Sequence, residues 1–319
     1  MAEFGSGWKT GAIHPGQTLL YAAFFLLPAL SPPLFGLLGS LLAAPVLYLL
    51  FFKGFRAGSM QLQASIMLAG LVALLLQRLE TFLFSLTLIP LGYALCRSAL
   101  QGESPAASGG KGALVLALTW LLFWGIFGAL AGVNPYTHLL QALDAGFKEM
   151  MEFSAKEQTG LSPEALYALQ QGIDEVRQGL PRLLPGVLAA MVPITVWGNM
   201  IAANGLARRF GLERPFWNRY ATWTLPDHLV WLPIAAGIGV LIGSGGFQNA
   251  SICVLFVAGI LYFFQGLAVC LALLDRWNTP VYMRIVLYLF LIFQSYGILL
   301  LALMGIGDVW INFRRSAKD

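Results

Sequence analysis

The sequence predicts an all-α fold: a polytopic integral membrane helical bundle of about eight or nine transmembrane helices, with an extra-membrane amphipathic helical hairpin. Of the 319 residues, 58% are hydrophobic and only 11% are charged, whereas soluble domains have about a quarter of their residues charged. Several apolar runs reach or approach the roughly 20 residues that cross a bilayer. One long segment, 134–182, is hydrophilic and repeats its apolar residues at helical spacing.

The N-terminal domain, residues 1–133, is expected to contain about five spans. The apolar runs are 17–30, 34–52, 57–76, 81–96 and 113–133. Ser31-Pro32-Pro33 separates the first two runs, which form either two spans with a tight turn or a re-entrant hairpin that does not cross. The span count depends on this choice. Lys53 and Arg56 form a short basic loop, which is expected on the cytoplasmic side.

The second domain, residues 134–182, is expected to be an acidic insertion on the outer face. Leu139, Leu143 and Phe147 follow helical spacing, and Ile173 and Val176 belong to a second apolar stripe. Gly160 ends the first helix, and Ser162-Pro163 is a good start for the second. Seven acids against four bases make the segment net negative. Two amphipathic helices on the membrane surface are the predicted structure.

The C-terminal domain, residues 183–319, is expected to contain about four spans with a basic cytoplasmic loop, 204–226. The spans are the apolar runs 183–203, 228–243, 250–274 and 285–307. We expect a multi-pass protein of the bacterial inner membrane with a cytoplasmic N-terminus. Nine spans would place Arg314, Arg315 and Lys318 outside, so basic residues leave the side of the C-terminus open.

Several functions are disfavoured by the residues present. The net charge of +4 fits basic cytoplasmic loops, so we expect no nucleic-acid partner. Gly109-Gly110-Lys111 lacks the spacing of a nucleotide-binding P-loop. His14, His138 and His228 are scattered, which predicts no metal site. Because no nucleophile and base occur at usable spacing, we expect neither an enzyme nor a bound cofactor.

Six polar residues in or beside the spans are candidates for binding a small polar or amphipathic ligand. They are Arg78, Glu80, Thr195, Asn199, Gln265 and Gln294. Arg78 and Glu80 lie between two apolar runs, where they either need a partner inside the membrane or sit at a tight turn in water. Thr195 and Asn199 face the same way on a helix, and hydrogen bonds between helices are the alternative explanation.

The loop 204–226 is a candidate surface for docking a partner or lipid. The candidate docking residues are Arg208, Arg209, Arg214, Phe216, Trp217, Arg219 and Trp223. In a protein interface the aromatics would be buried anchors. In an interfacial belt they would lie among lipid head groups, with the arginines near anionic lipid.

Small residues at four-residue intervals predict close helix packing. Gly128 and Gly132 form one such pair, and Ala235, Gly239 and Gly243 form a longer stripe. Contacts of this kind would serve other membrane subunits, a homo-oligomer, or the bundle itself.

The C-terminal part, from about residue 180 to 315, resembles the YybS-like family of predicted bacterial membrane proteins. The resemblance rests on Pro185-Gly186, Pro215-Phe216, Trp223, Leu225-Pro226-Asp227, Trp231 and the tail from Gly305 to Arg314. Asn312 stands where a second acid is expected. Through this family the chain is distantly similar to substrate-binding components of energy-coupling-factor transporters, although its first span lacks the Ala-xxx-Ala pattern of that group.

Two functional hypotheses follow. The first is a solute-binding or transport component without its own energy source, because the chain has no ATP site and few acids inside its spans. The alternative is a non-catalytic structural or scaffold subunit of a membrane complex, which would use the small-residue stripes and the aromatic loop as contact surfaces.

Overall fold

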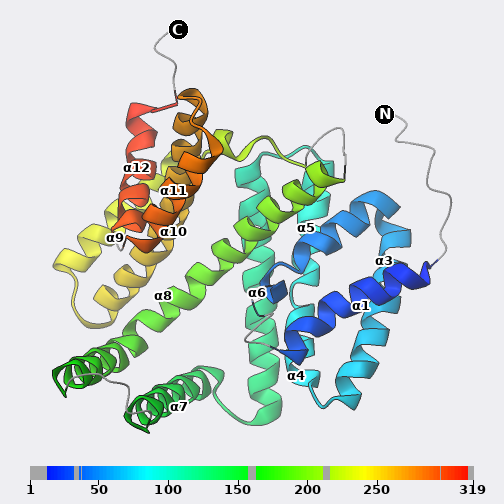
Figure 1. Ribbon diagram of the computed structural model, residues 1–319, viewed down its shortest axis with the longest axis horizontal. Helices are drawn as coiled ribbons and strands as arrows, with labels where there is room; N and C mark the ends of the chain where they lie inside the picture. Colours follow the sequence, from blue (N-terminus) through cyan, green and yellow to red (C-terminus); the bar gives the residue numbers. More distant parts are fainter. Residues whose placement is uncertain are drawn as a thin grey trace. The chain divides into compact units, whose positions relative to one another are not determined.

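The computed structural model describes residues 13–31, 36, 38–156, 163–210, 216–294 and 296–314, which are mostly helical and include no strand (Figure 1). Five helical stretches are long and apolar enough to cross a membrane: Ala43–Leu75, Leu79–Leu100, Pro105–Ala131, Gln171–Arg209 and Gly245–Arg276. Three shorter apolar helices are Pro15–Leu30, Asp227–Ile242 and Gly297–Ile311. The predicted all-α membrane helical bundle is confirmed.

The chain divides into two compact units. The first comprises residues 1–120, 191–230 and 259–319, and the second comprises 121–190 and 231–258. This division differs from the three consecutive domains expected from composition, because helices α6, α8 and α10 each contribute residues to both units.

Four N-terminal helices form the core of the first unit. They are α1 (Pro15–Leu30), α3 (Ala43–Leu75), α4 (Leu79–Leu86) and α5 (Ile89–Leu100). Leu47 of α3 and Leu91 of α5 are fully buried in this core. A Cβ at Gly92 would lie 2.6 Å from a methyl group of Val46, so α3 and α5 pack at very short distance.

The range of α3 comprises two helices that meet at a kink, between the residues Lys53 and Arg56 of the expected loop. Gly54 has φ +76°, a left-handed conformation that suits glycine. After the bend, Gly58 approaches the backbone of Leu50, and a Cβ there would lie 3.1 Å from its Cα. Glycine therefore makes the turn between two helices where the sequence predicted a break between two apolar runs.

Helix α8 (Pro163–Arg209) joins two elements that we expected to be separate. The second amphipathic helix and the following span form one continuous run of 47 residues. It follows α6 (Pro105–Ala131) and α7 (Pro135–Lys156). Pro181, Pro185 and Pro193 lie inside α8, so the proline-rich boundary does not break it. The expected turn at Gly160 lies outside the described residues.

The last expected span, 285–307, is two helices. Helix α9 (Trp231–Ile242) and helix α10 (Gly245–Arg276) precede α11 (Val281–Phe293) and α12 (Gly297–Ile311). Gln294 leaves the helical conformation with ψ 115°. A Cβ at Gly297 would overlap the carbonyl of Leu291, so the turn needs a glycine there. The polar residues interrupting this apolar run thus mark a break.

Two glycines let α10 and α12 cross in close contact. A Cβ at Gly266 would overlap the carbonyl of Leu301, and one at Gly305 would overlap the carbonyl of Tyr262. Cys270, Leu274 and Leu301 form a buried cluster beside this crossing. Helices α10, α11 and α12 run alongside one another in Figure 1. This crossing was not predicted, because neither glycine has a glycine partner four residues away in its own helix.

We predict that Gly266→Ala destabilises the protein by about 1–3 kcal/mol, since even one methyl group must force the two backbones apart. Thermal unfolding in detergent, followed by size-exclusion chromatography, would measure the loss. Gly259→Ala in the same helix is the matched control, because a Cβ there meets nothing within 4 Å. Equal stability of the two variants would contradict the crossing.

Candidate functional site

The segment that follows α8 is tied to the protein by an asparagine and a serine. Asn204 pairs with the backbone of Trp217: its Nδ2 donates to the Trp217 carbonyl and its Oδ1 accepts from the Trp217 N–H, both at 3.1 Å. The indole Nε1 of Trp217 donates to Ser108 Oγ at 2.9 Å. Trp217 is therefore buried in the first unit, and its ring is a structural anchor.

Tyr220 takes the segment deeper, between α8 and α10. It belongs to a short 3₁₀ helix, η1 (Tyr220–Thr222). Its ring lies edge-on to Trp197, whose ring stacks on Phe264 with centroids 4.2 Å apart. The Tyr220 hydroxyl donates to the Phe264 carbonyl.

Helix geometry shows how far this contact lies from the helix ends. Trp197 precedes Arg208 by about three turns, or about 16 Å along the axis of α8. Gln265, next to Phe264, precedes Asp275 by almost three turns, or about 15 Å along α10. The segment 216–230 therefore packs against α8 and α10 well inside their C-terminal ends, and we name it the re-entrant segment.

Gln265 and Asp308 meet beneath the re-entrant segment. Gln265 Oε1 accepts a hydrogen bond from the Leu225 N–H at 3.2 Å, and its Nε2 donates to Asp308 Oδ2 at 3.3 Å. Asp308 Oδ1 accepts from the Phe313 N–H at 3.1 Å. Both side chains are buried, and they join α10, α12 and the re-entrant segment into one polar network.

Arg314 completes the network from the C-terminal side. Its NH1 donates to the carbonyls of Ala221 at 3.1 Å and Trp223 at 2.7 Å. Its NH2 lies 3.1 Å from Asp308 Oδ2 as an ion pair. This approach is poorly aligned, since the buried Nε and NH2 have no hydrogen-bond partner in the described part of the chain. The guanidinium therefore has buried N–H groups that donate no hydrogen bond to the described residues.

The tail can return to the segment because α12 ends in a left-handed residue. Asn312 has φ 49° and ψ 63°, a conformation that asparagine tolerates, and its N–H bonds the Asp308 carbonyl. The position where an acid was expected thus works as the helix cap. We did not predict Asp308 or Arg314 as site residues. An acid inside the apolar run of α12 was the signal that could have indicated the first of them.

The six ligand candidates do not converge. Arg78 and Glu80 are exposed at the tight turn between α3 and α4. Gln294 is exposed in the turn between α11 and α12. Of the six, Gln265 belongs to the network just described.

Asn199 and Thr195 form a second, fully satisfied contact in the first unit. Asn199 Oδ1 accepts from the Ala44 N–H at 2.8 Å, and its Nδ2 donates to the carbonyls of Ser40 and Thr195 at 2.7 and 2.8 Å. Asn199 therefore satisfies backbone groups at the start of α3, as the alternative of hydrogen bonds between helices implied.

The basic loop separates into an exposed and a packed part. Arg208, Arg209 and Arg219 are exposed. Phe216 packs edge-on against Phe51, and Trp223 packs edge-on against Trp217 and Tyr220. Arg214 lies outside the described residues. The aromatic side chains thus contact the protein's own core and leave the arginines at the surface.

The small residues expected at helix contacts have two different positions. Gly239 packs against α10, since a Cβ there would meet Ser251 and Phe247, and Gly243 lies against Phe247. Ala235 precedes them in α9. Gly132 instead follows the end of α6 with φ +65°, and a Cβ at Gly128 would meet Pro135. This first pair therefore shapes the turn between α6 and α7.

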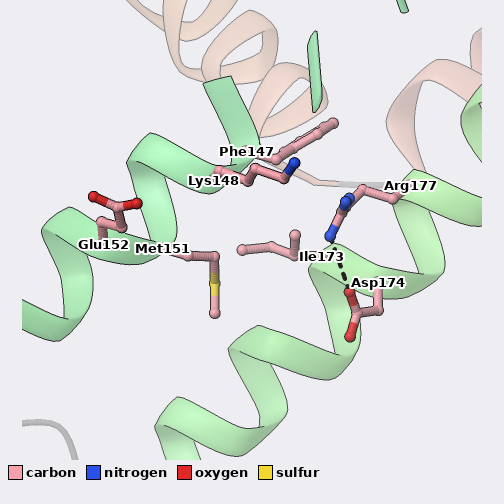
Figure 2. A pocket seen from close by; sticks show the side chains of 7 residues that line it. All are labelled: Phe147, Lys148, Met151, Glu152, Ile173, Asp174 and Arg177. Atoms are coloured by element: carbon pink, nitrogen blue, oxygen red, sulfur yellow. Dashed lines mark ion pairs between the residues drawn. The ribbon is translucent and has the colours of Figure 1, made fainter. Parts of the chain in front are cut away.

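The second unit contains a groove between α7 and the first part of α8, with a volume of about 350 Å³. Figure 2 shows Met151 and Ile173 pointing into it. Its lining comprises Phe147, Lys148, Met151, Glu152, Ile173, Asp174 and Arg177. Arg177 Nε donates to Asp144 Oδ1 at 2.8 Å, and Lys148 lies 3.0 Å from Asp144 Oδ2. Asp144 thus links the two amphipathic helices.

Comparison with known proteins gives one match. A family model described as a predicted membrane protein, DUF2232, matches residues 19–309. The chain belongs to this family. Searches of curated proteins and of solved structures find no match. The DUF2232 match covers every residue of the network except Phe313 and Arg314. It does not test the YybS-like or transporter resemblances, which stay predictions.

We predict that Arg314→Met exposes the backbone of the re-entrant segment, because the carbonyls of Ala221 and Trp223 lose their donor. Hydrogen–deuterium exchange of peptides covering 217–226 should become at least about tenfold faster, the equivalent of about 1.4 kcal/mol. Arg219→Met, which removes an exposed arginine of the same segment, should leave the exchange unchanged. Equal exchange in both variants would contradict the role of Arg314.

We predict that acid separates α7 from α8. Lys148 and then Arg177 hold the pKa of Asp144 below its ordinary value of 3.8. A lowered pKa means that this contact is fully present above pH 3.8 and is lost as the pH falls through the lowered value. Spin labels at Gln141→Cys and Gln178→Cys should show a broader distance distribution below that pH. Asp144→Asn should be broad already at neutral pH, whereas Glu149→Gln should behave as the parent protein.

Proposed function

We propose that this protein is a solute-binding or transport component of the membrane that takes its energy from another subunit. The observation that carries the proposal is the network of Gln265, Asp308 and Arg314 at the re-entrant segment. Ionisable residues at membrane depth are costly and usually functional. Transporters commonly build their sites near the middle of the bilayer from interrupted helices and unwound backbone.

The helices around this network are interrupted in the required way. A short 3₁₀ helix, η2 (Asp227–Val230), ends the re-entrant segment and leads directly into α9, and α11 and α12 divide an apolar run that could have formed a single span. Arg314 supplies buried Nε and NH2 donors without hydrogen-bond partners in the described residues. Buried donors of a charged group favour an acceptor such as a carbonyl, hydroxyl or water oxygen. Such a solute would be polar and would present oxygen to the guanidinium.

Native mass spectrometry of the protein in nanodiscs, purified with its associated components, tests this proposal. We expect a small molecule of reproducible mass. Arg314→Lys keeps the charge but removes the planar fork of donors, so occupancy should fall at least about tenfold. Arg219→Lys is the control and should retain the molecule. A wild-type protein that carries no small molecule but a stoichiometric protein partner would contradict the proposal.

A scaffold subunit is the second candidate, and it is favoured by α6. Almost none of the apolar stretch of this helix is buried within the chain. Leu121, Leu122, Ile126 and Leu130 are all more than half exposed. Such a helix meets either lipid or another membrane protein. The protein partner in the experiment above is the result that this second function requires.

A further inference from the structure

The re-entrant segment exposes polar side chains where it packs beside two apolar helices, α8 and α10. Its residues Tyr220 and Leu225 contact Phe264 and Gln265, about 15 Å along α10 from Asp275. The exposed residues of the segment include Asn218, Arg219, Thr222, Thr224, Pro226, Asp227 and His228. A lipid-facing loop of this composition would be strongly disfavoured, because charged side chains and irregular backbone both need polar surroundings.

Side chains long enough to reach the lipid head groups do not explain all of these exposed polar residues. A long arginine side chain such as that of Arg219 can extend to the head groups. Asp227 and His228 have short side chains and cannot do so. Irregular backbone at membrane depth is found where it is buried in protein or lines a water-filled cavity. Since these residues are exposed, the cavity is the arrangement that their surroundings favour.

We propose that the exposed face of the re-entrant segment lines a water-filled vestibule, open on the side where α8 and α10 end, at Arg209 and Arg276. This inference rests on the proposed function, for which the vestibule would be the route of a polar solute. Gln265 binds the backbone of Leu225 and Arg314 binds the backbone of Ala221 and Trp223, so these two side chains hold the wall in place. Asp308 contacts both of them. The mixed charges of Arg219 and Asp227 fit a neutral or zwitterionic solute better than a strongly charged one.

Substituted cysteines test the vestibule directly. In a background with Cys96, Cys253 and Cys270 changed to alanine, Thr224→Cys and His228→Cys are introduced one at a time. Membrane vesicles are treated from each side with a cationic, membrane-impermeant methanethiosulfonate reagent. Both thiols should react from one side only, within about tenfold of the rate at Arg208→Cys, because thiols ionise in water.

Leu303→Cys is the matched control for lipid. Leu303 is 59% exposed on α12, between Leu301 and Gly305, which contact α10 at the level of Gly266. Its thiol should react at least about a hundredfold more slowly than Thr224→Cys, because thiolate formation is suppressed in apolar surroundings. Full reaction of every variant after denaturation shows that the thiols are intact.

Two results would overturn the vestibule. Thr224→Cys and His228→Cys reacting as slowly as Leu303→Cys would place the segment against lipid or within protein. Protection that disappears when detergent separates a complex would show that a second copy or another subunit covers this face. Labelling and solute binding are measured separately. If the cysteines react but no small molecule is bound, the vestibule is supported and the proposed function is rejected.

Discussion

The structure depends on how backbone groups are satisfied where water is absent. Every N–H and C=O that leaves a helix inside the membrane needs a protein partner or a wet cavity. In the re-entrant segment, side-chain amides meet the backbone: Asn204 at Trp217 and Gln265 at Leu225. Arg314 binds two carbonyls of the same segment. Asn199 does the same for the start of α3. Amide side chains suit this task because each carries both a donor and an acceptor.

Close approach of α10 and α12 is a condition for this arrangement. Gln265 reaches Asp308 only because Gly266 and Gly305 remove the side chains that would separate the helices. Asp308 in turn receives the Phe313 N–H and lies beside Arg314, so the tail returns to the re-entrant segment. The glycine crossing, the buried acid and the tail are therefore one structural unit, although they occupy separate parts of the chain.

The sequence was sufficient to predict the fold class. Long apolar runs indicate segments surrounded by lipid, and in lipid such segments form helices because their backbone groups must bond to one another. The stripe of small residues predicted close packing at Gly239 without naming the partner, which in the structure is α10. Boundaries were less predictable. The break expected at 53–56 corresponds to the kink at Gly54, but Gln294 ends a helix inside the apolar run 285–307 that predicted a single span. Apolar content does not distinguish one long helix from two short ones, because both remove the same groups from water.

The candidate site was harder to predict, because its contacts join residues far apart in sequence. Gln265 was singled out, but Asp308 and Arg314 looked like ordinary residues at the end of a span. Their pairing is hard to explain by stability alone. A buried ion pair loses hydration that its attraction often fails to repay, and apolar residues of similar volume are frequently as stable. Here the pair is also incompletely bonded, since Nε of Arg314 lacks an acceptor among the described residues. An arrangement that only held the segment in place would have less need of a charged donor with unused capacity, and this is the physical reason to look for a solute at Arg314.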